Sequence, residues 1–320
     1  MIEVTGLTKR FGPITAVSGL NLRVSKGEIL GFLGPNGAGK STTMKIVAGY
    51  LLPSAGSVRI LGHDVERDSI AAQANTGYLP EGAPAYGDMT ARQFLRFIAE
   101  VRGYVGAGAR LRIDEAVSKT ELFAVLDQPI ETFSKGFKRR VGLAQAILHD
   151  PPVLIMDEPT DGLDPNQKHA VRALLREMSP EKAIIVSTHL LEEVEAICTR
   201  AVIIDRGQIV ADGTPSDLLR RSRYHNAVTL TLPANESERA RAALAALSAV
   251  RATEESNRTA ETVRITAFPQ DGARLIEVLT ELAVRERWTV MELYAEPGRL
   301  DDVFRALTTH DTAPPPRAAA

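Results

Sequence analysis

The chain has 320 residues, a formal net charge of −2 and ordinary proportions of hydrophobic (44%) and charged (24%) residues. This length predicts about two globular domains. The nearly neutral charge argues against a general nucleic-acid-binding protein, which is usually clearly basic, and the low aromatic content (5%) argues against base-stacking surfaces. The single cysteine, Cys198, excludes an internal disulfide and a cysteine-rich zinc site, as is typical of a reducing cytosolic setting.

The chain begins with apolar residues that alternate with polar ones over residues 1–25, which predicts a small antiparallel sheet. Its first residues indicate a strand rather than a signal peptide. No apolar run in the chain approaches the ~20 residues needed to cross a bilayer. We therefore expect any task at a membrane to depend on another chain that crosses it.

A glycine-rich loop follows, between a predicted strand over 28–33 and a predicted helix over 42–48. It matches the phosphate-binding pattern G-x-x-x-x-G-K-[ST]. The glycines leave room for backbone N–H groups to bond phosphate oxygens, the serine hydroxyl can ligate Mg²⁺, and Lys40 can reach the β- and γ-phosphates, which makes it a catalytic candidate. An ordinary glycine-rich turn is the alternative, but it would lack these flanks. The predicted nucleotide-binding residues of the loop are Gly34, Pro35, Asn36, Gly37, Ala38, Gly39, Lys40, Ser41 and Thr42.

A nucleotide in that loop would leave Phe11 and Val17, in the sheet ahead of it, free to flank the base. Stacking of Phe11 on an adenine ring would contribute roughly 1 kcal/mol. From its position alone, Phe11 could equally well be a plain core aromatic residue.

Residues 82–150 predict a mostly helical insert in an α/β domain. Glycines and prolines over 81–87 indicate a loop. Thr90 is expected to begin a helix, with Gln93 completing a capping box. Another helix is expected over about 112–126.

A further helix in this insert is predicted to begin at Ser134, which suits an N-cap and is followed by Lys135 and other basic residues. The positive end of the helix dipole and the basic run would make this start a second place for an anion. A solvated basic helix face is the alternative, and the local pattern taken alone favours it.

The apolar run over 153–156 predicts a buried parallel strand that ends in Asp157 and Glu158. Open α/β sheets bind ligands at the carboxyl ends of their strands. Asp157 suits Mg²⁺ through a bound water, and Glu158 suits the base that orients and deprotonates an attacking water. A helix cap is the alternative, but it would explain Asp157 and not two adjacent carboxylates. Residues 161–165 then predict a tight turn into a helix over 166–178.

A second buried strand is predicted over 183–187, and it leads into His189. A neutral histidine at the carboxyl end of a strand can bond a γ-phosphate oxygen or the lytic water. Taken alone, such a residue is more often structural.

The residue pattern changes at about residue 225, where predicted short strands and helices begin to alternate. This pattern predicts a small α+β domain of ferredoxin-like type. We therefore divide the chain into a nucleotide-binding domain over 1–222, an accessory domain over 223–310 and a tail over 311–320 that is disordered by composition.

Taken together, the motifs over about 1–220 resemble those of the ATP-binding subunits of ABC transporters. The glycine-rich loop resembles Walker A, the strand over 153–158 resembles Walker B with its catalytic glutamate, and the turn over 161–165 resembles the D-loop, with Asp164 as its nucleotide-site aspartate. The resemblance implies an α/β fold, namely a P-loop NTPase core with an N-terminal antiparallel β subdomain and a helical insert.

The resemblance changes two of the interpretations above. His189 falls at the family's switch histidine, and Phe11 falls where the family keeps its adenine-stacking aromatic residue. The family signature, usually Leu-Ser-Gly-Gly-Gln, is altered here, but Ser134 and Gly136 remain at its phosphate-contacting positions. Lys135 would add a cation beside the γ-phosphate.

Glu81 stands where the family usually has the glutamine of the Q-loop. Its charge would let it ligate Mg²⁺ more strongly than an amide does, or would alter how metal binding is relayed to a partner. The altered signature, Glu81 and the segment over 300–304 are similar to the corresponding parts of an exporter group that includes gliding-motility and multidrug-type ATPase subunits.

The resemblance implies ATP and Mg²⁺ as cofactors, a head-to-tail homodimer or a dimer with a related ATPase subunit, and a transmembrane permease as partner, with no nucleic acid. The chain would lie on the inner face of the cell membrane and power export by closing and opening the dimer. A soluble ABC-type ATPase acting on ribosomes or DNA is the alternative, although such proteins usually carry two cassettes or a long coiled coil. A non-hydrolysing regulator is disfavoured by Glu158 and His189.

Overall fold

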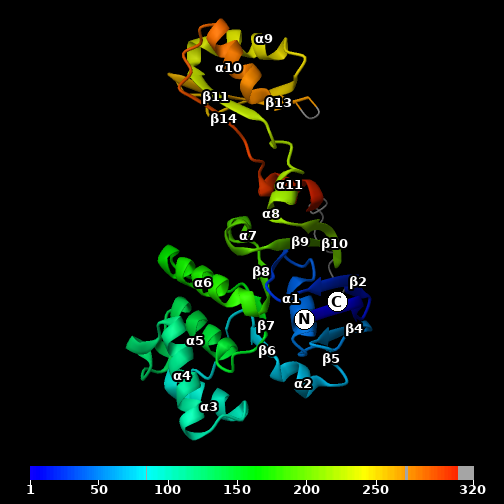
Figure 1. Cartoon of the computed structure of the whole chain (residues 1–320), viewed down its shortest axis with the longest axis vertical. Coiled ribbons are helices and arrows are strands. Elements are labelled where there is room, and N and C mark those ends of the chain that lie inside the picture. Colours follow the sequence, from blue (N-terminus) through cyan, green and yellow to red (C-terminus); the bar gives the residue numbers. More distant parts are fainter. Residues whose placement is uncertain (84, 271–272, 309–320) are drawn as a thin grey trace, which may run out of the picture. The chain divides into compact units, whose positions relative to one another are not determined.

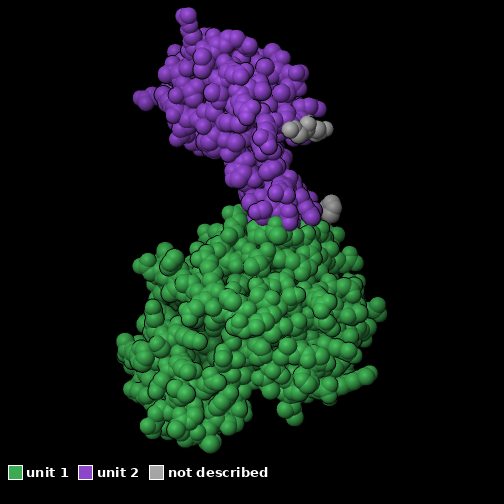
Figure 2. All heavy atoms as spheres, viewed as in Figure 1, with its two compact units in different colours: residues 1–215 green, residues 216–320 purple. Residues whose placement is uncertain are grey.

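A computed structural model describes the chain except for residues 84, 271–272 and 309–320 (Figure 1). The chain forms two compact units, Met1–Pro215 and Ser216–Ala320 (Figure 2). The predicted tail over 311–320 lies outside the described residues. Among the residues that are described, no helix combines the length and the hydrophobicity needed to span a bilayer.

The first unit contains the antiparallel sheet that the alternating pattern of residues 1–25 predicts. Its strands lie in the order β2-β1-β4-β5, and all its pairs are antiparallel. The apolar residues of β1 face a core that the sheet shares with α1 and the central strands. The strands are β1 (Ile2–Phe11), β2 (Ile14–Val24), β4 (Ala55–Ile60) and β5 (His63–Asp64).

A second sheet of the same unit has the order β10-β9-β3-β8-β7-β6. The neighbours from β9 to β6 are parallel, whereas β10 runs antiparallel to β9. The carboxyl ends of β3, β8, β7 and β6 therefore meet at one edge, and these four strands are buried along their whole length. The strands are β3 (Ile29–Leu33), β6 (Thr76–Leu79), β7 (Val153–Asp157), β8 (Ala183–Thr188), β9 (Arg200–Asp205) and β10 (Gln208–Gly213).

The helices of the predicted insert, α3, α4 and α5, lie together on the side of the unit away from the antiparallel sheet (Figure 1). The capping box of Thr90 and Gln93 is confirmed. The helix expected over 112–126 was misplaced, because Glu121 adopts a left-handed conformation (φ 53°) that ends it. The helices are α1 (Lys40–Val47), α2 (Ser69–Ala74), α3 (Ala91–Val101), α4 (Gly106–Thr120), α5 (Lys135–Ile147), α6 (Pro165–Met178) and α7 (Leu191–Ile197), with short 3₁₀ turns at Phe123–Val125, Ile130–Thr132 and Ser179–Glu181. Helix α8 (Pro215–Leu219) begins at the last residue of this unit and continues into the second one.

The second unit contains an antiparallel sheet in the order β12-β13-β11-β14, packed against α9 and α10. Its β-α-β-β-α-β element order is that of ferredoxin-like domains. Strand β12 was missed in the sequence because it is a polar edge strand without buried residues. The elements are β11 (Val228–Pro233), the 3₁₀ turn Ala234–Glu236, α9 (Ser237–Ala245), β12 (Val250–Ser256), β13 (Thr262–Pro269), α10 (Leu275–Arg285), β14 (Glu292–Ala295) and α11 (Leu300–Thr308).

The division between the units at residue 215 lies before the boundary predicted after residue 222. Two hydrogen bonds give the reason: the Ser222 hydroxyl donates to Asp302 Oδ2 at 2.8 Å, and the Arg223 backbone N–H donates to the same oxygen at 2.9 Å. These bonds attach the segment around residues 222–223 to α11 of the second unit. Composition alone does not reveal such long-range bonds.

Candidate functional site

The loop between β3 and α1 has a backbone shape that requires glycine. Gly37 (φ 82°) and Gly39 (φ 103°) adopt conformations that other residues rarely adopt. A Cβ on Gly39 would also lie 2.4 Å from the carbonyl oxygen of Ala16. The Thr43 hydroxyl donates to the Gly39 carbonyl at 2.9 Å and fixes the first turn of α1. The loop and the helix start can thus present backbone N–H groups to an anion.

Lys40 is buried in this loop. Its Nζ donates to the carbonyl oxygens of Gly34 at 2.6 Å and Pro35 at 3.0 Å. Burial lowers the pKa of Lys40, and the nearby carboxylates of Glu158 and Asp157 act in the opposite direction. Lys40 thus lies close to these two carboxylates and to the carbonyl groups of the loop.

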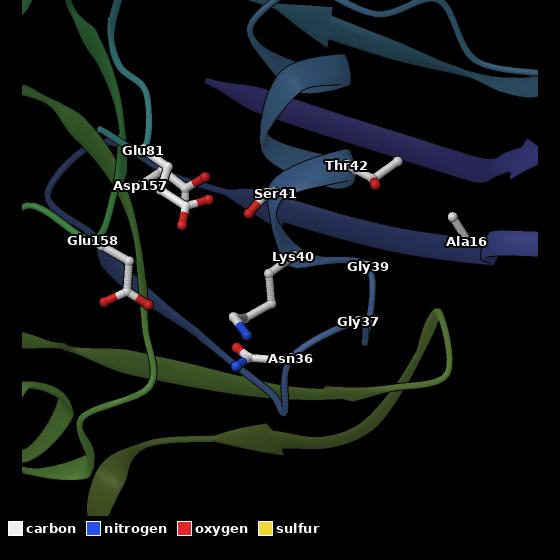
Figure 3. Close-up of a pocket in the computed structure, with 10 residues that line it drawn as sticks. All are labelled: Ala16, Asn36, Gly37, Gly39, Lys40, Ser41, Thr42, Glu81, Asp157 and Glu158. Atoms are coloured by element: carbon white, nitrogen blue, oxygen red, sulfur yellow. The ribbon is translucent and has the colours of Figure 1, made fainter. Parts of the chain in front are cut away.

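A cavity of about 250 Å³ lies over the loop (Figure 3). The hydroxyl of Ser41 and the carboxylates of Glu81 and Asp157 project toward one another in this view, and Glu158 lies on the same side of Lys40. The cavity brings together residues that follow β3, β6 and β7, as the meeting of their carboxyl ends predicts. It is lined by Ala16, Asn36, Gly37, Gly39, Lys40, Ser41, Thr42, Glu81, Asp157 and Glu158.

Three residues of the predicted loop support the cavity rather than line it. A Cβ on Gly34 would lie 2.4 Å from the Ile204 carbonyl oxygen. The Pro35 carbonyl accepts a hydrogen bond from the Ala38 N–H at 3.2 Å, and the Ala38 carbonyl accepts one from Gly207 at 2.9 Å. These residues shape the turn, and their predicted contact with a nucleotide stays a prediction.

Asp157 is a buried carboxylate whose two oxygens differ. Its Oδ1 accepts a hydrogen bond from the Ser187 hydroxyl, whereas Oδ2 is buried without a partner among the described residues. Such an orphaned oxygen is costly unless a ligand completes it. Together with Ser41 and Glu81 it forms an oxygen donor set that fits Mg²⁺. Within the described part of the chain, no three or more His, Cys, Asp or Glu residues form a metal cluster, so an ion here would need further oxygens from phosphate or water.

Glu158 follows Asp157 in a strained conformation. Its φ of 54° lies in the left-handed region, which is uncommon for a residue other than glycine. The backbone N–H of Glu158 donates to the Ser187 carbonyl at 3.1 Å and lies 3.3 Å from its hydroxyl. The carboxylate Oε1 lies 2.9 Å from Nδ1 of His189. The structure therefore pairs the predicted base with the predicted switch histidine, although His189 does not line the cavity.

The two residues expected to flank a base are placed differently. Phe11 is 46% exposed, which removes the interpretation as a plain core residue, and Lys9 Nζ lies 5.1 Å from its ring centre. Val17 is fully buried in the core of the antiparallel sheet, and its neighbour Ala16 lines the cavity instead. The structure thus corrects the expectation for Val17, because a side chain in this core cannot face a ligand.

The altered signature lies outside this cavity. Ser134 is the exposed N-cap of α5, and its hydroxyl accepts from the Phe137 N–H at 3.4 Å. Lys135, which was expected to add a cation beside the γ-phosphate, pairs with Asp161 of its own chain at 2.7 Å. Gly136 is buried, and a Cβ there would lie 2.8 Å from the side chain of Gln167.

Asp164 is also absent from the lining of the cavity. Its Oδ1 accepts from the Gln167 N–H at 2.9 Å and caps α6. The D-loop aspartate thus has a structural bond within its own chain.

Two residues of the site, Ala16 and Ser187, were not predicted from the sequence. Ser187 bonds to both Asp157 and Glu158, and the signal for it is a hydroxyl in the last part of an otherwise apolar buried strand. Ala16 carries no chemical signal, because only its position beside Gly39 brings it to the cavity.

Comparisons with known proteins show what the chain is similar to. A family model described as ABC transporter matches residues 17–161. The Nod factor export ATP-binding protein I of Paraburkholderia xenovorans is 38% identical over 219 residues, which cover 68% of this chain and 72% of that protein. The daunorubicin/doxorubicin resistance ATP-binding protein of Streptomyces peucetius is 34% identical over 311 residues, or 97% of this chain and 92% of that protein. A solved ATP-binding subunit of an ABC transporter matches with a TM-score of 0.65 and 32% identity, over 69% of this chain and 92% of that one. None of these descriptions mentions ribosomes or DNA.

Proposed function

Because the chain belongs to the family of ABC transporter ATP-binding subunits, we propose that it hydrolyses ATP in the loop cavity and thereby powers export through a membrane-spanning partner. The observation that carries the proposal is the buried Asp157 with its unpartnered Oδ2, in a cavity shared with Lys40 and Ser41. A nucleotide with its metal ion would complete that oxygen and relieve the cost of burying it.

The loop would hold the phosphates of ATP. Backbone N–H groups of Gly37 and Gly39 and the start of α1 face phosphate oxygens in this proposal, and Lys40 exchanges its loop carbonyls for them. When bound, Mg²⁺ would neutralise phosphate charge, and Ser41, Asp157 and Glu81 would hold it. Phe11 would stack on the adenine ring. The exposure of its side chain at the end of β1 supports this role.

Glu158 would act on the attacking water. Its carboxylate accepts the proton while the water oxygen bonds to the γ-phosphorus, and the bond to the β–γ bridging oxygen breaks to give ADP and phosphate. His189, 2.9 Å from Oε1, would keep the carboxylate oriented. The left-handed backbone of Glu158 supports this role, because strain of this kind is often retained where geometry serves function.

A second copy, or a related ATPase subunit, would complete the site. Ser134 is exposed at the start of the 13-residue helix α5 but does not line the cavity of its own chain. In a head-to-tail dimer, Ser134 and Gly136 of one copy would cap the ATP that the other copy holds. The dimer would bind a permease at the inner face of the cell membrane. Relatives named for export and drug resistance favour an exporter.

The Glu158→Gln variant tests this function. We expect turnover to fall about 100-fold or more, since an amide cannot accept the proton, while ATP binding persists and the dimer accumulates. ATPase assays and light scattering in saturating ATP and Mg²⁺ measure both effects. Glu195→Gln, an exposed carboxylate on α7, is the matched control and should behave as the original chain does. Unchanged turnover would remove Glu158 as the base, and a monomeric variant under these conditions would contradict the nucleotide-bridged dimer.

A further inference from the structure

Two cations of α5 converge on one carboxylate of the turn that follows Glu158. Lys135 Nζ lies 2.7 Å from Asp161 Oδ2, and Arg139, one helical turn further on, lies 3.9 Å from the same oxygen. The Lys135 stem crosses Gly162 so closely that a Cβ there would lie 2.6 Å from Lys135 Cδ. Gly162 also has a φ of 74°, so this close crossing occurs where glycine is the favoured residue.

Asp161 connects this cluster to the base. Its backbone N–H donates to the Glu158 carbonyl at 3.1 Å and closes the turn in which Glu158 holds its left-handed conformation. A hydrogen bond from Lys135, helped by the charges of Lys135, Arg139 and His189, lowers the pKa of Asp161, which therefore stays ionised at neutral pH. A displacement of Asp161 would thus pass directly to the Glu158 turn.

Arg139 links the same cluster to a second loop of the site. It is only 3% exposed, and its guanidinium donates to the Pro80 carbonyl at 3.1 Å. Pro80 directly precedes Glu81, which lines the cavity. Helix α5 therefore holds both the turn that carries Glu158 and the loop that carries Glu81.

We propose that Lys135, together with Arg139, is a positioning group that acts through Asp161 on the Glu158 turn of its own chain, and not a ligand of phosphate. This inference rests on the proposed function, and it replaces the expectation of a cation beside the γ-phosphate. It also assigns two tasks to α5: its Ser134 faces the second copy, while its next turn aligns the base of its own copy.

A double-mutant cycle tests the proposal with Lys135→Met, Asp161→Asn and the two combined. If Lys135 acts through Asp161, each single change should lower kcat about three- to tenfold with little change in KM for ATP, and the combined variant should be no slower than the slower single variant. Lys135→Arg should keep most of the activity. Lys138→Met removes the same charge from the same helix, at a residue with no ion pair among those described, and should leave turnover unchanged.

Other outcomes overturn the proposal. Losses that multiply in the combined variant would show that the two residues act independently. A raised KM for Lys135→Met at unchanged kcat would show that Lys135 binds nucleotide, and an unchanged kcat in both single variants would show that the pair has no role in turnover. Ser134→Arg tests the composite site separately. Full activity in that variant would refute the dimer proposal. If that variant is inactive but the losses from Lys135→Met and Asp161→Asn multiply in the combined variant, only the positioning role is refuted.

Discussion

Two buried carboxylates, Asp157 in the first unit and Glu296 in the second, differ in how fully they are bonded. Glu296 Oε1 accepts from the Thr229 hydroxyl at 2.9 Å and from Arg299 at 2.8 Å. Asp157 accepts one hydrogen bond from the Ser187 hydroxyl, and its other oxygen is buried with no partner in the described ranges. A satisfied buried carboxylate stabilises the fold around it, whereas an unsatisfied one in a cavity reserves a position for a ligand.

The same contrast applies to the surroundings of the two groups. Asp157 is followed by a strained Glu158 and lies in a cavity lined with polar groups. Glu296 lies beside a cluster in which Arg299 stacks on Tyr224 at 3.8 Å. We therefore expect changes at Asp157 to affect turnover and changes at Glu296 to affect stability, and the following predictions test this distinction.

The largest effect is expected for Asp157→Asn. The amide oxygen can keep the bond from Ser187, but the charge that would hold the metal ion is lost, so turnover should fall about 100-fold or more. Stability should not fall, because a costly buried charge is removed. ATPase assays and thermal unfolding followed by circular dichroism measure the two effects. A variant that unfolds at clearly lower temperature would show that Asp157 serves the fold rather than a ligand.

The converse change, Glu296→Ala, should cost the second unit about 2 kcal/mol, because it removes the acceptor of the buried Thr229 hydroxyl together with the charge partner of the exposed Arg299. Urea unfolding followed by the emission of Trp288, the only tryptophan and a member of this unit's core, measures the loss. Glu292→Ala is the control: its carboxylate is exposed, and its bonds to neighbouring side chains should contribute at most about 1 kcal/mol. Equal losses in the two variants would contradict the distinction.

Sequence patterns predicted the parts of this site that depend on local order. Continuous apolar runs identified the buried strands, and the parallel pairing of β3, β7 and β8 explains why Lys40, Asp157 and His189 follow their strands at the same edge of the sheet. The glycine pattern predicted the loop because its conformations are specific to glycine.

Tertiary contacts limited the prediction elsewhere. The ion pair of Lys135 with Asp161 depends on how α5 packs, so the sequence pattern after Ser134 did not predict it. Val17 was predicted to flank the nucleotide base because the sequence alone does not distinguish apolar residues on one face of the antiparallel sheet from those on the other. The left-handed conformation of Glu158 was not predicted, because the residue at this position is not a glycine.

An unsatisfied group outside the cavity should affect stability alone, and His149 provides that case. Its Nε2 lies 3.2 Å from the Thr76 carbonyl, and its Nδ1 is buried with no partner in the part of the chain that the structure describes. Burial lowers the pKa of His149 to about 4, helped by the charge of Arg102. The unfolded chain therefore binds the extra proton first, so the free energy of unfolding should fall by about 2 kcal/mol between pH 7 and pH 5 from this group. The free energy of unfolding, measured in urea at both pH values, should show this fall for the original chain and not for His149→Gln. An equal pH dependence in the two proteins would contradict the assignment.

The smallest effect is expected for Phe11, the exposed aromatic residue of the first unit's sheet. Phe11→Ala should weaken ATP binding about fivefold, which corresponds to the loss of roughly 1 kcal/mol of stacking. Binding of inorganic triphosphate should be unchanged, because the phosphate loop is untouched. Calorimetric titration measures both affinities. Ile14→Ala, at the exposed position paired with Phe11 in the β1–β2 hairpin, controls for general effects on this sheet. Equal ATP affinity in the Phe11 variant would mean that the adenine ring lies elsewhere, whereas a matching loss for triphosphate would mean that the change disturbs the phosphate loop itself.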